Sequence, residues 1–155
     1  MHLVMADLRA TGLARASCDG AMSLDAIDTI PRADGRSAAI REAARLVRPG
    51  ARFVLTTWER DAPSRVVQPV REPVGDYRPL LTQAGFELDS YEESPDWRLR
   101  DRAVIERIIE AEAALREELG DEAASAMVGV ARGRLGELQD CRRVFATARR
   151  GSQTS

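Results

Sequence analysis

The segment AARLVRPGARFVL, residues 43–55, passes from the end of a helix into a buried strand. Apolar residues at 40, 43, 44 and 47 form one stripe, which predicts a helix over residues 37–47. Pro49 and Gly50 end that helix. Residues 52–58 follow at once and are rich in β-branched, aromatic and apolar side chains, as is typical of a strand. A helix that leads directly into a buried strand indicates an α/β fold.

The same reading assigns the rest of the chain. Apolar runs predict buried strands at 3–6 and 18–24, and a short helix over 77–84 leads to a strand at 86–91. Residues 104, 108, 111, 115 and 119 form the apolar face of one long helix, predicted over 97–119. A further helix begins near Asp121 and carries one apolar side to residue 138, and a last strand covers 141–148.

This alternation predicts an α/β domain with a mainly parallel sheet. Because its strands are continuously apolar, we expect helices on both faces of the sheet. The domain is expected to cover residues 1–148, with 97–139 as a helical insertion before the last strand. Residues 149–155 are polar and are expected to form a disordered tail.

Composition excludes several classes of protein. The chain has 155 residues and a formal net charge of −2, whereas a dedicated nucleic-acid binder is usually strongly basic. No apolar run approaches the length of a membrane helix. The first residues lack the basic flank of a signal peptide, so we expect a cytoplasmic protein.

All 23 basic residues are arginine, which reflects a biased composition, so the arginine excess is not interpreted as an anion site. The absence of lysine excludes Schiff-base chemistry on a lysine. Cys18 and Cys141 are expected to be reduced. His2 is the only histidine and the cysteines are far apart, so no metal site and no Ser-His or Cys-His mechanism is expected.

Four segments carry a family resemblance: VMADL at 4–8, ASCDGAMSLDA at 16–26, the opening segment at 43–55, and LLTQAGFE at 80–87. Together they resemble class I S-adenosylmethionine (SAM)-dependent methyltransferases, in particular the small-molecule branch. The order and spacing match over residues 3–91, and loosely to 148. The resemblance implies an incomplete Rossmann-like methyltransferase sheet with flanking helices, SAM as cofactor and a small-molecule acceptor.

The resemblance also implies site residues. The cofactor set is Asp7 and Leu8 beside the adenine, with Ser23, Leu24 and Asp25 near the methionine end. The expected substrate residues are Trp58, Tyr77 and Trp97, with Asp76 a weaker candidate, and Asp25 or Glu59 is a candidate general base. Structural roles stay open for all of them: Asp7 can cap a turn, Asp25 can cap a helix, and the others can be ordinary surface or core residues.

The family begins with a strand, a glycine-rich turn and an acidic ribose-binding residue, and none of these is found before Asp7. The chain therefore resembles the C-terminal part of a methyltransferase, truncated and weakly active or inactive alone. In that case strand 3–6 has no neighbours and strand 18–24 exposes an apolar edge. We expect either that residues 3–6 move beside 18–24 or that two copies pair through this edge as a homodimer.

Two other functions remain open. One is a non-catalytic interaction or dimerisation module derived from a methyltransferase, which the exposed edge motivates. The other is an unrelated doubly wound nucleotide binder, which the missing glycine-rich phosphate turn disfavours.

Overall fold

A computed structural model of the chain describes residues 5–64 and 71–152. Four strands and five α-helices follow one another in the order β1 (Cys18–Leu24), α1 (Ala33–Leu46), β2 (Val47–Arg60), α2 (Arg78–Gln83), β3 (Phe86–Glu93), α3 (Trp97–Glu110), α4 (Glu112–Leu119), α5 (Asp121–Glu137) and β4 (Cys141–Arg150). Short 3₁₀ turns, η1 (Ile27–Thr29) and η2 (Leu138–Asp140), precede α1 and β4. The predicted passage from helix to strand at residues 43–55 is confirmed.

The strands form one mixed sheet in the order β1-β2-β4-β3. Strand β1 pairs with β2 in parallel, whereas β4 lies antiparallel to both β2 and β3. Three strands therefore run in one direction and β4 runs against them. The expected α/β architecture is confirmed. The expectation of mainly parallel pairing is wrong, because β4 lies between β2 and β3 and is antiparallel to both.

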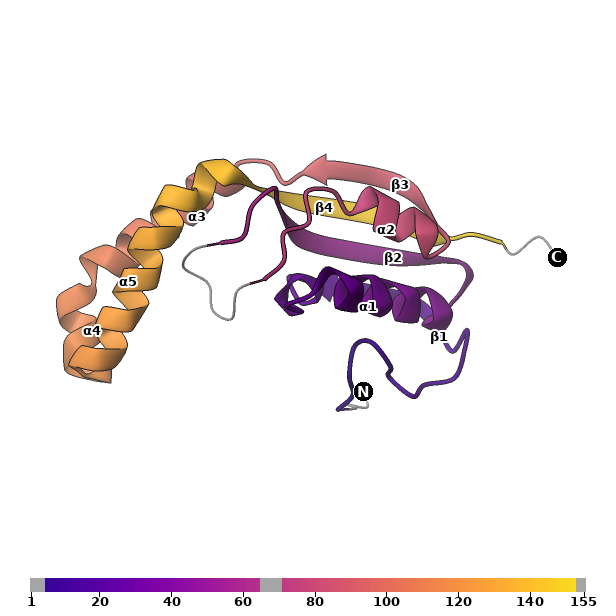
Figure 1. The fold of residues 1–155 in the computed structure, drawn as a ribbon, viewed down its shortest axis with the longest axis horizontal. Helices are drawn as coiled ribbons and strands as arrows, with labels where there is room; N and C mark the ends of the chain where they lie inside the picture. The colour runs from indigo at the N-terminus through magenta and orange to yellow at the C-terminus, as the bar shows by residue number, and fades with distance from the viewer. Residues whose placement is uncertain (1–4, 65–70, 153–155) are drawn as a thin grey trace.

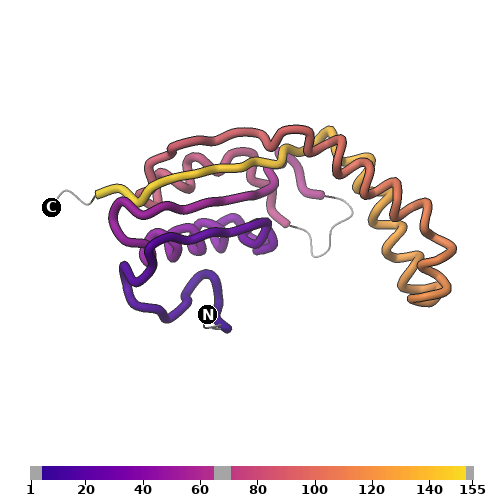
Figure 2. The backbone as a smooth tube through the Cα atoms, turned by 180° about the vertical axis from the view of Figure 1, so that it is seen from behind, coloured from indigo at the N-terminus to yellow at the C-terminus, as the bar shows by residue number. Residues whose placement is uncertain are grey.

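Helices α1 and α2 lie on the same face of the sheet (Figure 1), and the view from behind places the strands in front of them (Figure 2). This covered face carries the main core, formed on the sheet by Phe53, Leu55, Val144, Ala146 and Ala148. The opposite, open face carries Met22, Leu24, Val54 and Phe145. Met22 is 71% exposed and Leu24 58% exposed. The expectation of helices on both faces is therefore wrong for the part of the chain described.

Helices α3, α4 and α5 form an arm that leaves one end of the sheet (Figures 1 and 2). Trp97 and Ile105 of α3 pack with Ala131 of α5 in its core. The single helix predicted over 97–119 is divided at Ala111 into α3 and α4. Of the predicted stripe, Ile108 packs against the arm core as expected, whereas Val104 is exposed and its neighbour Ile105 is buried instead.

The two ends of the chain differ from the prediction. Of the strand predicted at 3–6, residues 3 and 4 lie outside the described residues, and Met5 and Ala6 have no regular structure and do not pair with β1. At the other end, Arg149 and Arg150 belong to β4. The N–H of Gly151 donates to the carbonyl oxygen of Gly85. The predicted disordered tail was therefore wrong for its first residues, and 153–155 lie outside the described part.

Within residues 5–64 and 71–152, no helix combines the length and apolarity needed to cross a membrane. Over the same residues, no cluster of three or more His, Cys, Asp or Glu side chains is arranged to hold a metal ion.

Candidate functional site

Two cavities lie on either side of the turn that follows β1, and each is bordered by one residue of that turn. The edge cavity, of about 210 Å³, lies between β1 and α1 and is lined by residues that include Leu8, Ser23, Leu24, Ile27 and Phe53. The end cavity, of about 220 Å³, is lined by residues that include Asp28, Arg36, Trp58, Arg71 and Tyr77. Ile27 and Asp28 are consecutive, so one turn borders both cavities. Ligands of open α/β sheets commonly bind beyond the carboxyl ends of parallel strands, where this turn lies.

The edge cavity brings together Leu8, Ser23 and Leu24 from the expected cofactor set. Its other walls are mostly apolar and come from the inner side of α1 and from Phe53. Three polar side chains also line it: Thr11 and Glu42 bond to each other, whereas the Ser23 hydroxyl is buried and has no hydrogen-bond partner among the described residues. A buried hydroxyl without a partner is costly, so it is a natural contact for a ligand with a polar group.

Asp7, expected beside the adenine, does not line this cavity, and its side chain is 48% exposed. Its carboxylate accepts from the backbone N–H and the guanidinium of Arg9, and these bonds lower its pKa to about 2. The Ala10 N–H donates to the Asp7 carbonyl oxygen and closes a turn. This geometry corresponds to the turn-capping alternative.

Asp25 lies at the end of β1, in the left-handed backbone region with φ of 50°. The Thr56 hydroxyl donates to one of its carboxylate oxygens at 3.0 Å, and Arg143 donates to the other at 2.5 Å. It makes no side-chain cap to η1, so the capping alternative does not hold there. Strained backbone of this kind persists where neighbours over-determine it, often at functional sites.

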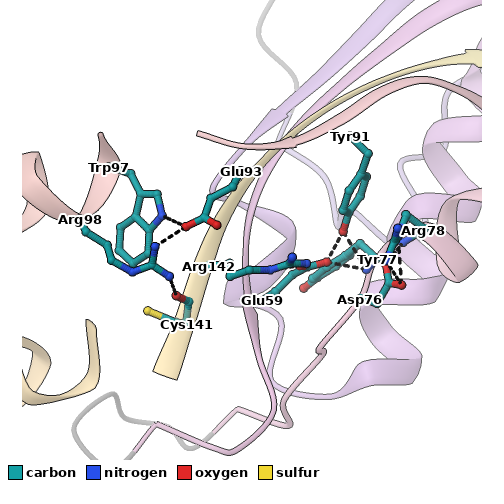
Figure 3. Close-up of polar contacts among 10 residues, drawn as sticks. All are labelled: Glu59, Asp76, Tyr77, Arg78, Tyr91, Glu93, Trp97, Arg98, Cys141 and Arg142. Carbon is teal, nitrogen blue, oxygen red and sulfur yellow. Dashed lines mark hydrogen bonds and ion pairs between the residues drawn. The ribbon is translucent and has the colours of Figure 1, made fainter. Parts of the chain in front are cut away.

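Glu59 lies at the centre of a buried polar cluster on the covered face (Figure 3). Its carboxylate accepts from the Tyr77 backbone N–H at 3.0 Å, from the Tyr91 hydroxyl, and from the Arg142 guanidinium. The side chain is only 2% exposed. Burial and the hydrogen bond to Glu59 raise the pKa of Tyr91. A carboxylate that is almost wholly buried and has both oxygens engaged links β2, β3 and β4, and this geometry disfavours it as a general base.

The three expected substrate residues occupy different places. Trp58 and Tyr77 line the end cavity, although Tyr77 is almost wholly buried. Trp97 lies instead in the arm core, edge-on to Trp58 at 5.1 Å, and its indole N–H donates to Glu93 at 2.6 Å (Figure 3). Asp76 accepts from the backbone N–H of Arg78 at 2.8 Å and closes the turn before α2.

Sequence reasoning missed the charged residues of the end cavity: Asp28, Arg36, Arg60, Arg71, Glu72 and Arg134. Burial raises the pKa of Asp28, and Arg71 opposes that rise. Since every basic residue of the chain is arginine, no pattern in the sequence singled these arginines out.

No protein-family model and no curated protein matches this chain. Solved structures do match it, with low sequence identity. The [4+2]-cyclase SpnF has a TM-score of 0.76 at 19% identity, over 94% of this chain and 54% of its own. A putative sarcosine dimethylglycine methyltransferase from Galdieria sulphuraria has a TM-score of 0.74 at 15% identity, over 93% of this chain and 57% of its own. Phosphoethanolamine N-methyltransferase 2 from Haemonchus contortus, with bound S-adenosylhomocysteine, has a TM-score of 0.73 at 15% identity, over 94% of this chain and 36% of its own.

The chain has the class I methyltransferase fold. It spans about half the length of the first two structures and about a third of the last. One of the three is named a cyclase, so the methyltransferase fold does not by itself fix the reaction. The predicted incomplete Rossmann-like sheet is confirmed.

Proposed function

We propose that this chain forms one half of a SAM-dependent methyltransferase that acts on a small molecule. The observation that carries the proposal is the pair of cavities bordered by Ile27 and Asp28, at the carboxyl end of β1 in a methyltransferase fold. The edge cavity takes the cofactor, and the end cavity takes the methyl acceptor. The protein acts in the cytoplasm.

SAM, when bound, supplies a methyl group attached to a positively charged sulfur. The residues present fit part of such a molecule: Leu8 offers apolar contact, and the unpartnered Ser23 hydroxyl offers a hydrogen bond. The sequence contains no G-x-G turn for the methionine part. We propose that residues beyond this sequence complete that part of the site.

The acceptor is a small molecule by analogy with two of the similar structures. One is named for sarcosine and dimethylglycine, and another contains phosphomonomethylethanolamine. Methyl transfer depends mainly on positioning the acceptor in line with the methyl group. Where an acceptor must lose a proton, Asp25 is the more exposed of the two candidate bases, because its side chain is one-third exposed whereas Glu59 is buried. To act as a base it would have to release Arg143, and it lies next to the edge cavity rather than in its lining.

A titration of SAM into the ¹⁵N-labelled chain, followed by NMR, tests the cofactor half of the proposal. Amide resonances of Ser23, Leu24 and Ile27 are expected to move, whereas those of α4 in the arm stay fixed. Ser23→Ala removes the hydroxyl and weakens binding, while Ser37→Ala on the outer part of α1 is the matched control. If saturating SAM moves no resonance around the edge cavity of the folded protein, the proposal is wrong.

The interaction-module alternative has one specific observation in its favour. Among the described residues no strand pairs with the outer edge of β1, and Met22 and Leu24 are exposed beside it. We propose that a second copy of the chain can pair there, and the oligomeric state in solution tests this.

A further inference from the structure

Arg36 is a buried cation without a carboxylate partner among the described residues. The side chain belongs to α1 and is only 2% exposed. Its guanidinium donates to the carbonyl oxygen of Ile30 at 2.9 Å and to the carbonyl oxygen of Glu72. Its Nε atom is buried and has no hydrogen-bond partner within residues 5–64 and 71–152. A buried charge is costly unless an opposite charge and hydrogen bonds compensate it, so Arg36 is poised for an anion.

The other charges around the end cavity are engaged elsewhere. Arg60 lies 3.3 Å from Glu137, and Arg134 lies 3.6 Å from Asp101. The carboxylate of Glu72 accepts from the backbone N–H of Ala33 at 2.8 Å, at the start of α1. Among the described residues, Arg36 is therefore left with no carboxylate bonded to it, and the charge of nearby Asp28 acts on it without an ion pair or hydrogen bond.

Arg71 is a second arginine with unused hydrogen-bonding capacity. It reaches Asp28 only at 3.5 Å, beyond a good charge-assisted hydrogen bond. Among the described residues, neither the buried Nε of Arg71 nor one buried carboxylate oxygen of Asp28 has a hydrogen-bond partner. An anionic group between Arg36 and Arg71 would give both guanidinium groups a partner.

The remaining walls are apolar or aromatic, formed by Trp58, Pro73, Val74 and Tyr77. Ligand sites typically combine such walls with a few polar groups that fix orientation. We infer that the end cavity binds a small molecule with a carboxylate or phosphate group, held by Arg36 and Arg71, and an apolar body against Trp58. That this molecule is the methyl acceptor rests on the proposed function; that the cavity binds it does not.

The test titrates benzoate, phenyl phosphate and neutral benzamide into the full chain by calorimetry. The titrations are made at about pH 5, where a phosphate monoester is still singly charged because its second pKa is about 6. Both anions then share the charge and the ring, so their relative affinity distinguishes a carboxylate ligand from a phosphate ligand. Benzamide keeps the ring but lacks the charge, and we expect it to bind about tenfold more weakly, the size of one charge-assisted hydrogen bond.

Arg71→Gln is the decisive variant, because Arg71 is one-third exposed and its loss leaves the core intact. We expect it to weaken anion binding about tenfold. Arg41→Gln, on the exposed side of α1, is the matched control and should leave binding unchanged. Arg36→Lys keeps the charge but loses the planar guanidinium that can donate two hydrogen bonds to one anion, so it should also weaken binding. Thermal unfolding curves show which variants are folded.

Equal binding of benzamide and benzoate, or equal losses in Arg71→Gln and Arg41→Gln, would overturn the inference, as would the absence of anion binding by the folded chain. The SAM titration separates this inference from the proposed function. If the chain binds the anions but SAM shifts no amide resonance from Ser23 to Ile27, the anion site is supported and the proposed methyltransferase function is wrong. If SAM shifts these resonances but no anion binds, the methyltransferase function is supported and the inference of an anionic ligand is wrong.

Discussion

The two faces of the sheet have similar side chains and different surroundings. Leu55 on β2 points to the covered face and is wholly buried, whereas Leu24 on neighbouring β1 lies on the open face and is 58% exposed. Both belong to apolar strands of the kind that a sequence reading places in a core. An apolar strand therefore shows that a surface is available for burial, and the number of helices present decides whether it is buried.

The largest expected effect separates the two faces directly. Leu55→Ala leaves a cavity under α1 and should lower the free energy of unfolding by about 2–5 kcal/mol. Leu24→Ala removes the same atoms from an exposed position and should change it by about 0.5 kcal/mol or less. Urea denaturation followed by circular dichroism measures both. Equal losses would show that the open face is covered in solution.

The next effect compares two carboxylates. Glu59→Gln weakens the bond to Arg142 inside the covered face and should cost about 1–3 kcal/mol. Asp25→Asn weakens a more exposed pair with Arg143, and asparagine tolerates positive φ, so we expect a cost of about 1 kcal/mol or less. The same denaturation experiment applies. A larger loss for Asp25→Asn would contradict the anchoring role of Glu59.

A smaller effect depends on pH and concerns the border between α1 and the N-terminal segment. The Glu42 carboxylate accepts from Arg45 and from the N–H and hydroxyl of Thr11, and these bonds lower its pKa to about 2. Because the folded-state pKa is depressed, this stabilisation is fully present above the ordinary value of 4.5 and is lost as the pH falls towards 2.

The Thr11 amide resonance reports this titration. We expect its NMR chemical shift to change with a midpoint near pH 2. The Glu42→Gln variant lacks the transition and is the control. A midpoint near pH 4.5 would show that the contact between Thr11 and Glu42 is not formed in solution.

The sequence predicts the individual helices and strands better than it predicts which strands pair with one another. The strand at 52–58 and the helix from Asp121 follow from local periodicity, and both exist. The antiparallel insertion of β4 joins residues about ninety positions apart, so no local pattern shows it. Ala111 interrupts a helix without glycine or proline, and nothing in the local sequence signals that break.

The candidate site likewise contains residues that the sequence predicts and residues that only the structure shows. Leu8, Ser23 and Leu24 were expected together because the family resemblance orders them along the chain, and they line one cavity. Glu59 was expected near the substrate as a candidate base, but its partner Arg142 comes from the last strand, and only the folded chain shows that the two are paired. Arg36 and Arg71 are two of 23 arginines, and nothing in the sequence distinguishes them. Only the structure shows that their Nε atoms are buried without partners among the described residues.

The smallest effect on stability gives the sharpest test of the open edge. Met22 is 71% exposed on β1, so Met22→Lys should change the free energy of unfolding by about 0.5 kcal/mol or less. If two copies pair through β1, however, the lysine places a charge in that contact and should halve the mass measured by light scattering, because charged side chains on edge strands oppose pairing. Met127→Lys on α5 adds the same charge at a methionine that is 43% exposed and should leave the mass unchanged. An unchanged mass for Met22→Lys would reject pairing through this edge, and the open face would then be a surface that the chain leaves in water or covers with a different partner.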